Sequence, residues 1–126
     1  MLIMSDQLPA ELREFLARHI DSIAQLEALL LLRSAPDAVW DTQATAKRLY
    51  IGQQEASEAL AHLAAHRLLS GDAAGYRFGP QTQELLGMVE LLAEHYKRHL
   101  IPITNLIHAK PRRIRQFADA FKLKRD

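Results

Sequence analysis

The chain has 126 residues, of which 48% are hydrophobic, and it contains no cysteine. This length and composition fit one domain with an extension, and they provide enough apolar side chains for a core. The lack of cysteine excludes disulfides and thiolate metal sites. The longest apolar run, residues 28–32, is far too short to cross a bilayer, and the first residues lack a signal-peptide pattern. We therefore expect a cytoplasmic protein without an integral membrane segment.

The net charge of +1 conceals an uneven distribution. Residues 1–94 contain seven Lys and Arg against thirteen Asp and Glu, whereas residues 95–126 contain nine against two. An acidic body followed by a basic tail indicates either a tail that binds an anionic partner or two surfaces that bind each other.

Two helices are expected at the N-terminal end. Pro9 fits the first turn of one helix, whose cap is Ser5 or Asp6. The second helix starts at Asp21 or Ser22 and is apolar on all sides towards its end, so we expect it to be central. The Ser-Ala-Pro-Asp sequence that follows should stop it.

Residues 41–80 carry the clearest pattern: a short helix, a tight turn, a longer helix and a hairpin. Gly52 lies between the two helices, where a turn residue or N-cap is required. Residues 68–69 are predicted to end the longer helix, residues 71–75 to form a loop, and residues 76–78 to return as a strand. The inward-facing positions are Ala46, Leu49, Ile51, Ala56, Leu60 and Leu63.

A short apolar pair, Val39 and Trp40, precedes this region. It is a candidate first strand of a three-stranded sheet, after which Asp41 or Thr42 caps the next helix. We expect Trp40 to pack against the central helix, because a lone aromatic residue beside an apolar segment usually belongs to the core. A ligand-stacking role for Trp40 is the alternative.

This order of elements resembles the winged helix-turn-helix family, over about 40 to 50 residues and through small and apolar positions. The predicted fold class is mostly α. It is a winged helix-turn-helix with a small β-hairpin wing, N-terminal helices, a long C-terminal helix and a basic amphipathic tail. Residues 1–80 are assigned to the winged domain with its N-terminal helix, 81–109 to a dimerisation helix and 110–126 to the tail.

The long helix is expected to begin near Gln81 or Thr82, and Pro102 must kink or end it. We interpret its apolar stripe as the seam of a homodimer, as in the MarR-like and PadR-like families that the chain is similar to. The alternative is that the helix folds back on the first two helices. The stripe consists of Leu85, Leu86, Val89, Leu92 and Tyr96.

The resemblance implies a transcriptional regulator that binds double-stranded DNA. Gln53, Gln54 and Ser57 are competent to read base edges, whereas Lys47 and Arg48 are suited to phosphates. Carboxylates on the same helix count against DNA, because they repel phosphate unless cations compensate. The full predicted DNA-binding set is Lys47, Arg48, Gln53, Gln54, Ser57, Glu58, His62, Arg67 and Arg77.

The basic tail supports an alternative function. Residues 112–122 are predicted to form an amphipathic helix with apolar side chains on one face and cations on the other. A winged-helix adaptor would use such a helix to bind a protein partner, and an anionic lipid surface is a third candidate. The predicted partner-binding residues are Arg112, Arg113, Ile114, Arg115, Phe117 and Phe121.

Catalysis and metal binding are not predicted. His62 and His66, like His95 and His99, have the spacing that can hold a metal ion, but neither pair lies in a recognised metal pattern. Histidines on helix surfaces are therefore the favoured interpretation. No catalytic triad order, phosphate-binding glycine loop or dinucleotide fingerprint occurs, so we expect no enzyme and no cofactor.

Overall fold

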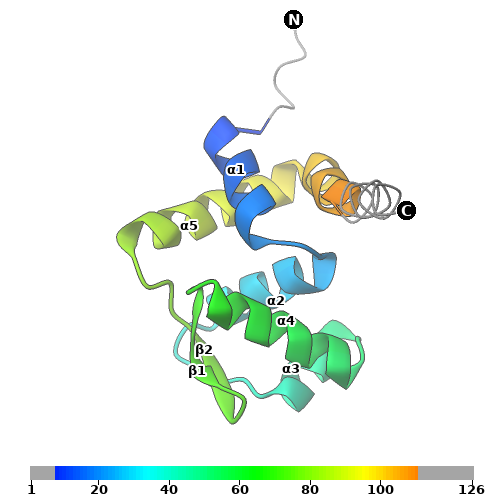
Figure 1. Cartoon of the computed structure of the whole chain (residues 1–126), viewed down its shortest axis with the longest axis vertical. Coiled ribbons are helices and arrows are strands. Elements are labelled where there is room, and N and C mark those ends of the chain that lie inside the picture. Colours follow the sequence, from blue (N-terminus) through cyan, green and yellow to red (C-terminus); the bar gives the residue numbers. More distant parts are fainter. Residues whose placement is uncertain (1–7, 111–126) are drawn as a thin grey trace, which may run out of the picture.

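The computed structural model describes residues 8–110. The fold is mostly helical with a small two-stranded antiparallel sheet, as the sequence predicted at this coarse level (Figure 1). A further helix covers residues 100–110. The elements are α1 (Ala10–His19), α2 (Ile23–Ser34), α3 (Thr42–Leu49), α4 (Gln53–Ala65), β1 (Leu69–Asp72), β2 (Gly75–Phe78) and α5 (Gln83–Arg98).

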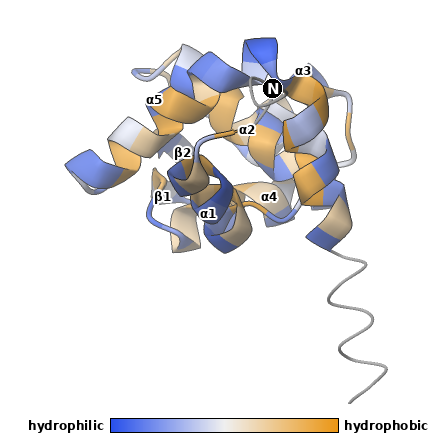
Figure 2. Cartoon of the chain, turned by 90° about the horizontal axis from the view of Figure 1, so that it is seen from above, coloured by the Kyte–Doolittle hydropathy of each residue, from blue (hydrophilic) through white to orange (hydrophobic). Residues whose placement is uncertain are grey.

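Helix α2 is central, as predicted. Its N-cap is Ser22, whose hydroxyl accepts a hydrogen bond from the backbone N–H of Gln25 at 3.1 Å. The side chain of Gln25 in turn accepts from the N–H of Asp21, so two backbone donors at the helix start are satisfied. Helix α2 packs against α3, α4 and β2. Figure 2 shows hydrophobic and hydrophilic stretches alternating along the helices, as expected when each helix buries one face.

The α3–turn–α4 unit also forms as predicted at its start. The Asp41 carboxylate caps α3 by accepting from the N–H of Ala44 at 2.7 Å, and Gly52 is the N-cap of α4. The end of α4 differs from the prediction, because the helix stops at Ala65 and Arg67 adopts a left-handed conformation with φ 65°. Leu68 and Leu69 therefore do not end the helix. Leu68 precedes the hairpin and Leu69 is the first residue of β1, and both are buried in the core.

The hairpin is tighter than predicted. Strands β1 and β2 pair from Leu69 with Phe78 to Asp72 with Gly75, so most of the expected loop belongs to the strands. Gly71 is required here: its φ is 104°, and a Cβ would lie 2.2 Å from the carbonyl oxygen of Gly75.

The predicted third strand is reduced to one residue. Trp40 forms a single antiparallel bridge with Tyr76, with N–O distances of 2.7 and 2.8 Å. Strand β2 therefore lies between β1 and this bridge. Trp40 packs against the core, as expected.

Helix α5 buries part of its apolar stripe within the single chain, while Leu85, Leu86 and Tyr96 remain half-buried. Thr82 caps the helix, as predicted, and a second helix follows with Pro102 in its first turn. Val89 and Leu92 are both 0% exposed within the single chain, because α5 lies against α1. The Arg33 guanidinium of α2 also donates to the Glu90 carboxylate, with Nε to Oε2 at 3.0 Å. The alternative, that the helix folds back on the first two helices, is what the structure contains.

Two sets of predictions fall outside the described residues. Ser5 and Asp6 were the expected caps of the first helix, whereas α1 has Pro9 at its N-cap position and no side-chain cap bond. The predicted amphipathic segment 112–122 also lies beyond residue 110. Within residues 8–110, no helix is long and apolar enough to span a membrane.

We expect Leu92→Ala to lower the free energy of unfolding by about 2–5 kcal/mol, because it opens a cavity in a well-packed core. The loss should be the same at low and high protein concentration, since the cavity lies inside one chain. Chemical denaturation at two concentrations measures this. Val39→Ala, at a 59% exposed position, is the control and should change stability by less than about 0.5 kcal/mol. A loss that disappears on dilution would indicate a dimer seam instead.

Candidate functional site

The exposed face of α4 gathers most of the residues predicted to read bases. Gln53, Gln54, Ser57 and Glu58 are all exposed, while the opposite face of the helix is buried. The Gln54 amide donates to the Glu58 carboxylate at 3.2 Å. The N-terminal half of α4 therefore presents a polar surface with both donors and acceptors.

The predicted phosphate-binding cations are more scattered. Lys47 and Arg48 are exposed in the last turn of α3, close to the start of α4. Arg67 follows the opposite end of α4, and a helix of this length spans about 20 Å. Arg77 is exposed on β2, where it pairs with Ser70. Only Lys47 and Arg48 are thus brought close to the start of α4.

His62 does not face outward as predicted. Its side chain is only 20% exposed, and its Nε2 lies 2.7 Å from the backbone oxygen of His19. Helical spacing explains the difference, because His62 lies on the flank of α4 that faces the end of α1. The ring therefore donates to a helix C-terminal carbonyl.

His62 belongs to a second cluster, which we call the histidine–lysine junction: His19, Asp21, His62, His66 and Lys110. The Nδ1 atoms of His19 and His66 lie 2.9 Å apart, close enough to share one proton in a hydrogen bond. The rings of His62 and His66 stack with centroids 4.2 Å apart. The junction thus connects α1, α4 and the helix of residues 100–110.

Lys110 closes this junction. Its Nζ donates to the backbone oxygens of Leu16, Ala17 and Ile20 at 3.1, 2.8 and 2.7 Å. It also pairs with the Asp21 carboxylate at 2.6 Å, and the side chain is only 11% exposed. A cation at this place satisfies the free carbonyls at the C-terminus of α1 and the negative end of its dipole.

Sequence reasoning missed this role and assigned Lys110 to the tail. One signal was present: Lys110 follows Ile103 and Ile107 at helical spacing, and both isoleucines are buried. Only the position of α1 in the fold shows that the ammonium group of Lys110 has backbone carbonyl oxygens to donate to.

The pKa values of His19, His66 and Asp21 are all lowered in the junction. Burial lowers the pKa of His19, and the His66 ring and the Arg18 guanidinium lower it further. Burial and the His62 ring likewise lower the pKa of His66, against the opposing pull of Asp21. Burial alone would raise the pKa of Asp21, but the hydrogen bond and charge of Lys110 lower it overall. The folded junction therefore favours the neutral forms of His19 and His66.

The two histidine pairs are not arranged as metal sites. The rings of His95 and His99 stack with centroids 5.3 Å apart, as those of His62 and His66 also stack. Among the described residues, no group of three or more His, Cys, Asp and Glu side chains is placed to hold a metal ion. The junction instead joins α1, α4 and the helix of residues 100–110 through hydrogen bonds.

Comparison of the chain with protein-family models, with curated proteins and with solved structures finds no match. The α4 face and the histidine–lysine junction are therefore the features from which function is inferred.

We expect the free energy of unfolding to fall as the pH decreases below about 6.5, the ordinary pKa of histidine. His19 and His66 have lowered pKa values in the fold, so the unfolded chain binds more protons below that pH, and acid favours unfolding. Urea denaturation between pH 5 and pH 8 measures the slope.

His66→Gln should flatten this pH dependence, because it removes one titrating ring of the junction. His108→Gln is the matched control, since His108 is exposed and lies outside the junction. Equal slopes for the two variants would contradict the assignment of the pH dependence to the junction.

We expect Lys110→Met to lower the free energy of unfolding by about 1–3 kcal/mol, because it removes the ammonium donor from the carbonyl oxygens of Ala17 and Ile20 and from the Asp21 carboxylate. Methionine keeps an apolar stem of similar length, so the loss reports the ammonium group. Thermal or chemical denaturation of the purified variant measures it. Lys97→Met changes an exposed lysine of α5 and should have almost no effect; a loss equal to this control would show that the Lys110 contacts are not stabilising.

Proposed function

We propose that the chain is a winged helix-turn-helix transcriptional regulator that binds double-stranded DNA. The observation that carries this proposal is the exposed polar face of α4, in the second helix of a tight helix–turn–helix pair. The arrangement around it supports the fold assignment. Helices α2, α3 and α4 pack together, and β2 pairs on one side with β1 and on the other with Trp40.

The chemistry of the α4 face suits base recognition. The major groove of B-DNA admits an α-helix, and glutamine side chains pair with the edge of adenine through two hydrogen bonds. Gln53 and Gln54 provide such side chains, and Ser57 adds a hydroxyl one turn further along the helix. Residues in the first turns of a recognition helix are those that reach base edges in helix-turn-helix proteins.

The cations near this face would position the helix on the duplex. Lys47 and Arg48 lie in the turn of α3 that precedes α4, where they can reach phosphates on one side of the groove. Arg77 is exposed on the hairpin and would contact the backbone from the wing. Arg67, at the far end of α4, contributes only if the duplex extends along the whole helix.

The carboxylates of α4 make the expected binding weak and salt-dependent. Glu58 accepts a hydrogen bond from Gln54, and a carboxylate in the major groove can accept from the amino group of cytosine. Glu55 is exposed in the first turn, where the helix dipole favours it. Both repel phosphates, so affinity depends on Lys47 and Arg48.

We further propose that the regulator acts as a homodimer, so that two α4 helices bind two half-sites. The stripe of α5 offers less contact area than its sequence indicates, because Val89 and Leu92 are already buried within the single chain. Leu100 and Ile101, exposed at 47% and 69%, are the better candidates. The alternative, an adaptor that binds a protein through residues 110–126, concerns a segment of which only Lys110 is described, and α1 and Asp21 already hold its side chain.

We expect the purified protein to select a sequence from a random DNA pool at physiological salt, and Lys47→Glu/Arg48→Glu to abolish that binding. Binding of the unchanged protein should weaken with salt, because each phosphate contact contributes about −0.9 to the slope of log K against log salt. Fluorescence anisotropy with the selected duplex measures both quantities.

Lys97→Glu/Arg98→Glu is the control for this experiment, since it makes the same change of charge at exposed residues at the end of α5. Binding that survives in the Lys47/Arg48 variant would refute the proposed surface. Binding lost equally in both variants would indicate a nonspecific effect of net charge.

A further inference from the structure

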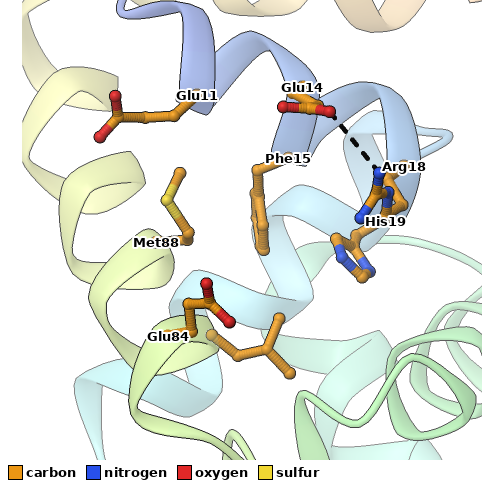
Figure 3. Close-up of a pocket in the computed structure, with 8 residues that line it drawn as sticks. Glu11, Glu14, Phe15, Arg18, His19, Glu84 and Met88 are labelled. Atoms are coloured by element: carbon orange, nitrogen blue, oxygen red, sulfur yellow. Dashed lines mark ion pairs between the residues drawn. The ribbon is translucent and has the colours of Figure 1, made fainter.

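A groove of about 250 Å³ lies between α1 and the start of α5. Figure 3 shows Phe15 of α1 and Met88 of α5 facing each other across it. Leu85 adds a third apolar side chain to this floor. The carboxylates of Glu11, Glu14 and Glu84 surround it (Figure 3). The groove thus combines an apolar floor with an acidic rim.

Two of the three carboxylates have no cation partner among the described residues. Glu14 pairs with Arg18 at 3.6 Å, and both side chains are well exposed. Glu11 and Glu84 form no ion pair within residues 8–110. A ligand that suits this groove therefore carries positive charges together with apolar side chains.

We propose that this groove binds segment 112–122 of the same chain. That segment has the complementary pattern, because Ile114, Phe117 and Phe121 stand at helical spacing. Its cations are Arg112, Arg113, Arg115 and Lys122, against the single carboxylate of Asp119. It is also the part of the sequence in which positive charge is most concentrated, while the preceding residues are acidic. This binding is independent of whether the protein binds DNA.

The attachment point of the segment lies within reach of the groove. Lys110 is held at the carbonyl end of α1, and His19, at the same end of α1, lines the groove. Helix α1 has 10 residues and is about 15 Å long. The 12 residues 111–122 span about 18 Å as a helix and about 40 Å when extended. Lys110 contacts Leu16, Ala17 and Ile20, which lie on the flank of α1 opposite to the groove. The segment must therefore pass around α1 to reach the groove, and its extended length is sufficient for this.

The short connection favours the chain's own segment over that of another molecule. A binding segment tethered by a few residues of the same chain experiences an effective concentration of roughly millimolar, far above that of a second copy in dilute solution. Individual exposed ion pairs are weak, so the binding should be reversible and sensitive to salt.

Paramagnetic relaxation in the full chain tests this proposal. The chain contains no cysteine, so Ala120→Cys introduces a single site for a nitroxide label without changing the charge. In uniformly ¹⁵N-labelled protein we expect broadening of the amide signals of Glu11, Phe15, Glu84 and Met88. A mixture of ¹⁵N-labelled protein without the nitroxide and unlabelled protein that carries it should show no such broadening.

Charge variants in the same background test the acidic rim. Glu11→Gln/Glu84→Gln should reduce the broadening about fivefold, because two weak ion pairs are lost. Glu55→Gln/Glu58→Gln, an equal change on the exposed face of α4, should leave it unchanged. Phe117→Ala/Phe121→Ala should also reduce it, which tests the apolar contribution, and the same spectra report whether each variant is folded.

Three results would overturn the proposal. Absence of broadening at the groove would show that the segment does not bind there. Broadening only in the mixed sample would assign the groove to a second copy. Equal broadening in the Glu11/Glu84 variant and its control would remove the acidic rim as the cause.

Discussion

The burial of α2 is the constraint on which the rest of the structure depends. Leu26, Leu29 and Leu32 are fully buried, and the helix is apolar on nearly every side over its second half. Such a helix needs cover on all sides, because each exposed leucine would cost about 1.5–3 kcal/mol of transfer free energy. Helices α3 and α4 and strand β2 supply part of that cover directly. The remaining cover must come from segments distant in the sequence.

Helices α1 and α5 pack against each other and complete the core. Leu12, Val89 and Leu92 are fully buried although 70 or more residues separate α1 from the α5 positions. This packing buries Val89 and Leu92 of the α5 stripe within one chain. The polar face of α4 and the start of the helix of residues 100–110 remain exposed to solvent. The surface proposed to bind DNA is therefore a part of α4 that is not buried in the core.

The histidine–lysine junction couples this core to protonation and to the beginning of the basic segment. Lys110 is the last residue of the described helix 100–110, and its ammonium group donates to carbonyls at the C-terminal end of α1. His66, the C-cap of α4, shares a hydrogen bond with His19 at that same end of α1. We therefore expect acid to weaken the contact between α1 and α4, since two charged imidazoles cannot share one proton. The same junction holds Lys110, the last described residue, at the C-terminal end of α1.

Local chemistry in the sequence determined the helix starts, the hairpin and the mostly helical class, because caps at Ser22, Asp41 and Thr82 and the spacing of apolar residues act over a few positions. It also identified the polar residues of α4. Tertiary structure alone decided which apolar stripe is covered, that His62 faces α1, and that Lys110 has buried acceptors. Periodicity shows that a face is apolar but not which distant segment covers it, so these features depend on contacts between residues far apart in the chain.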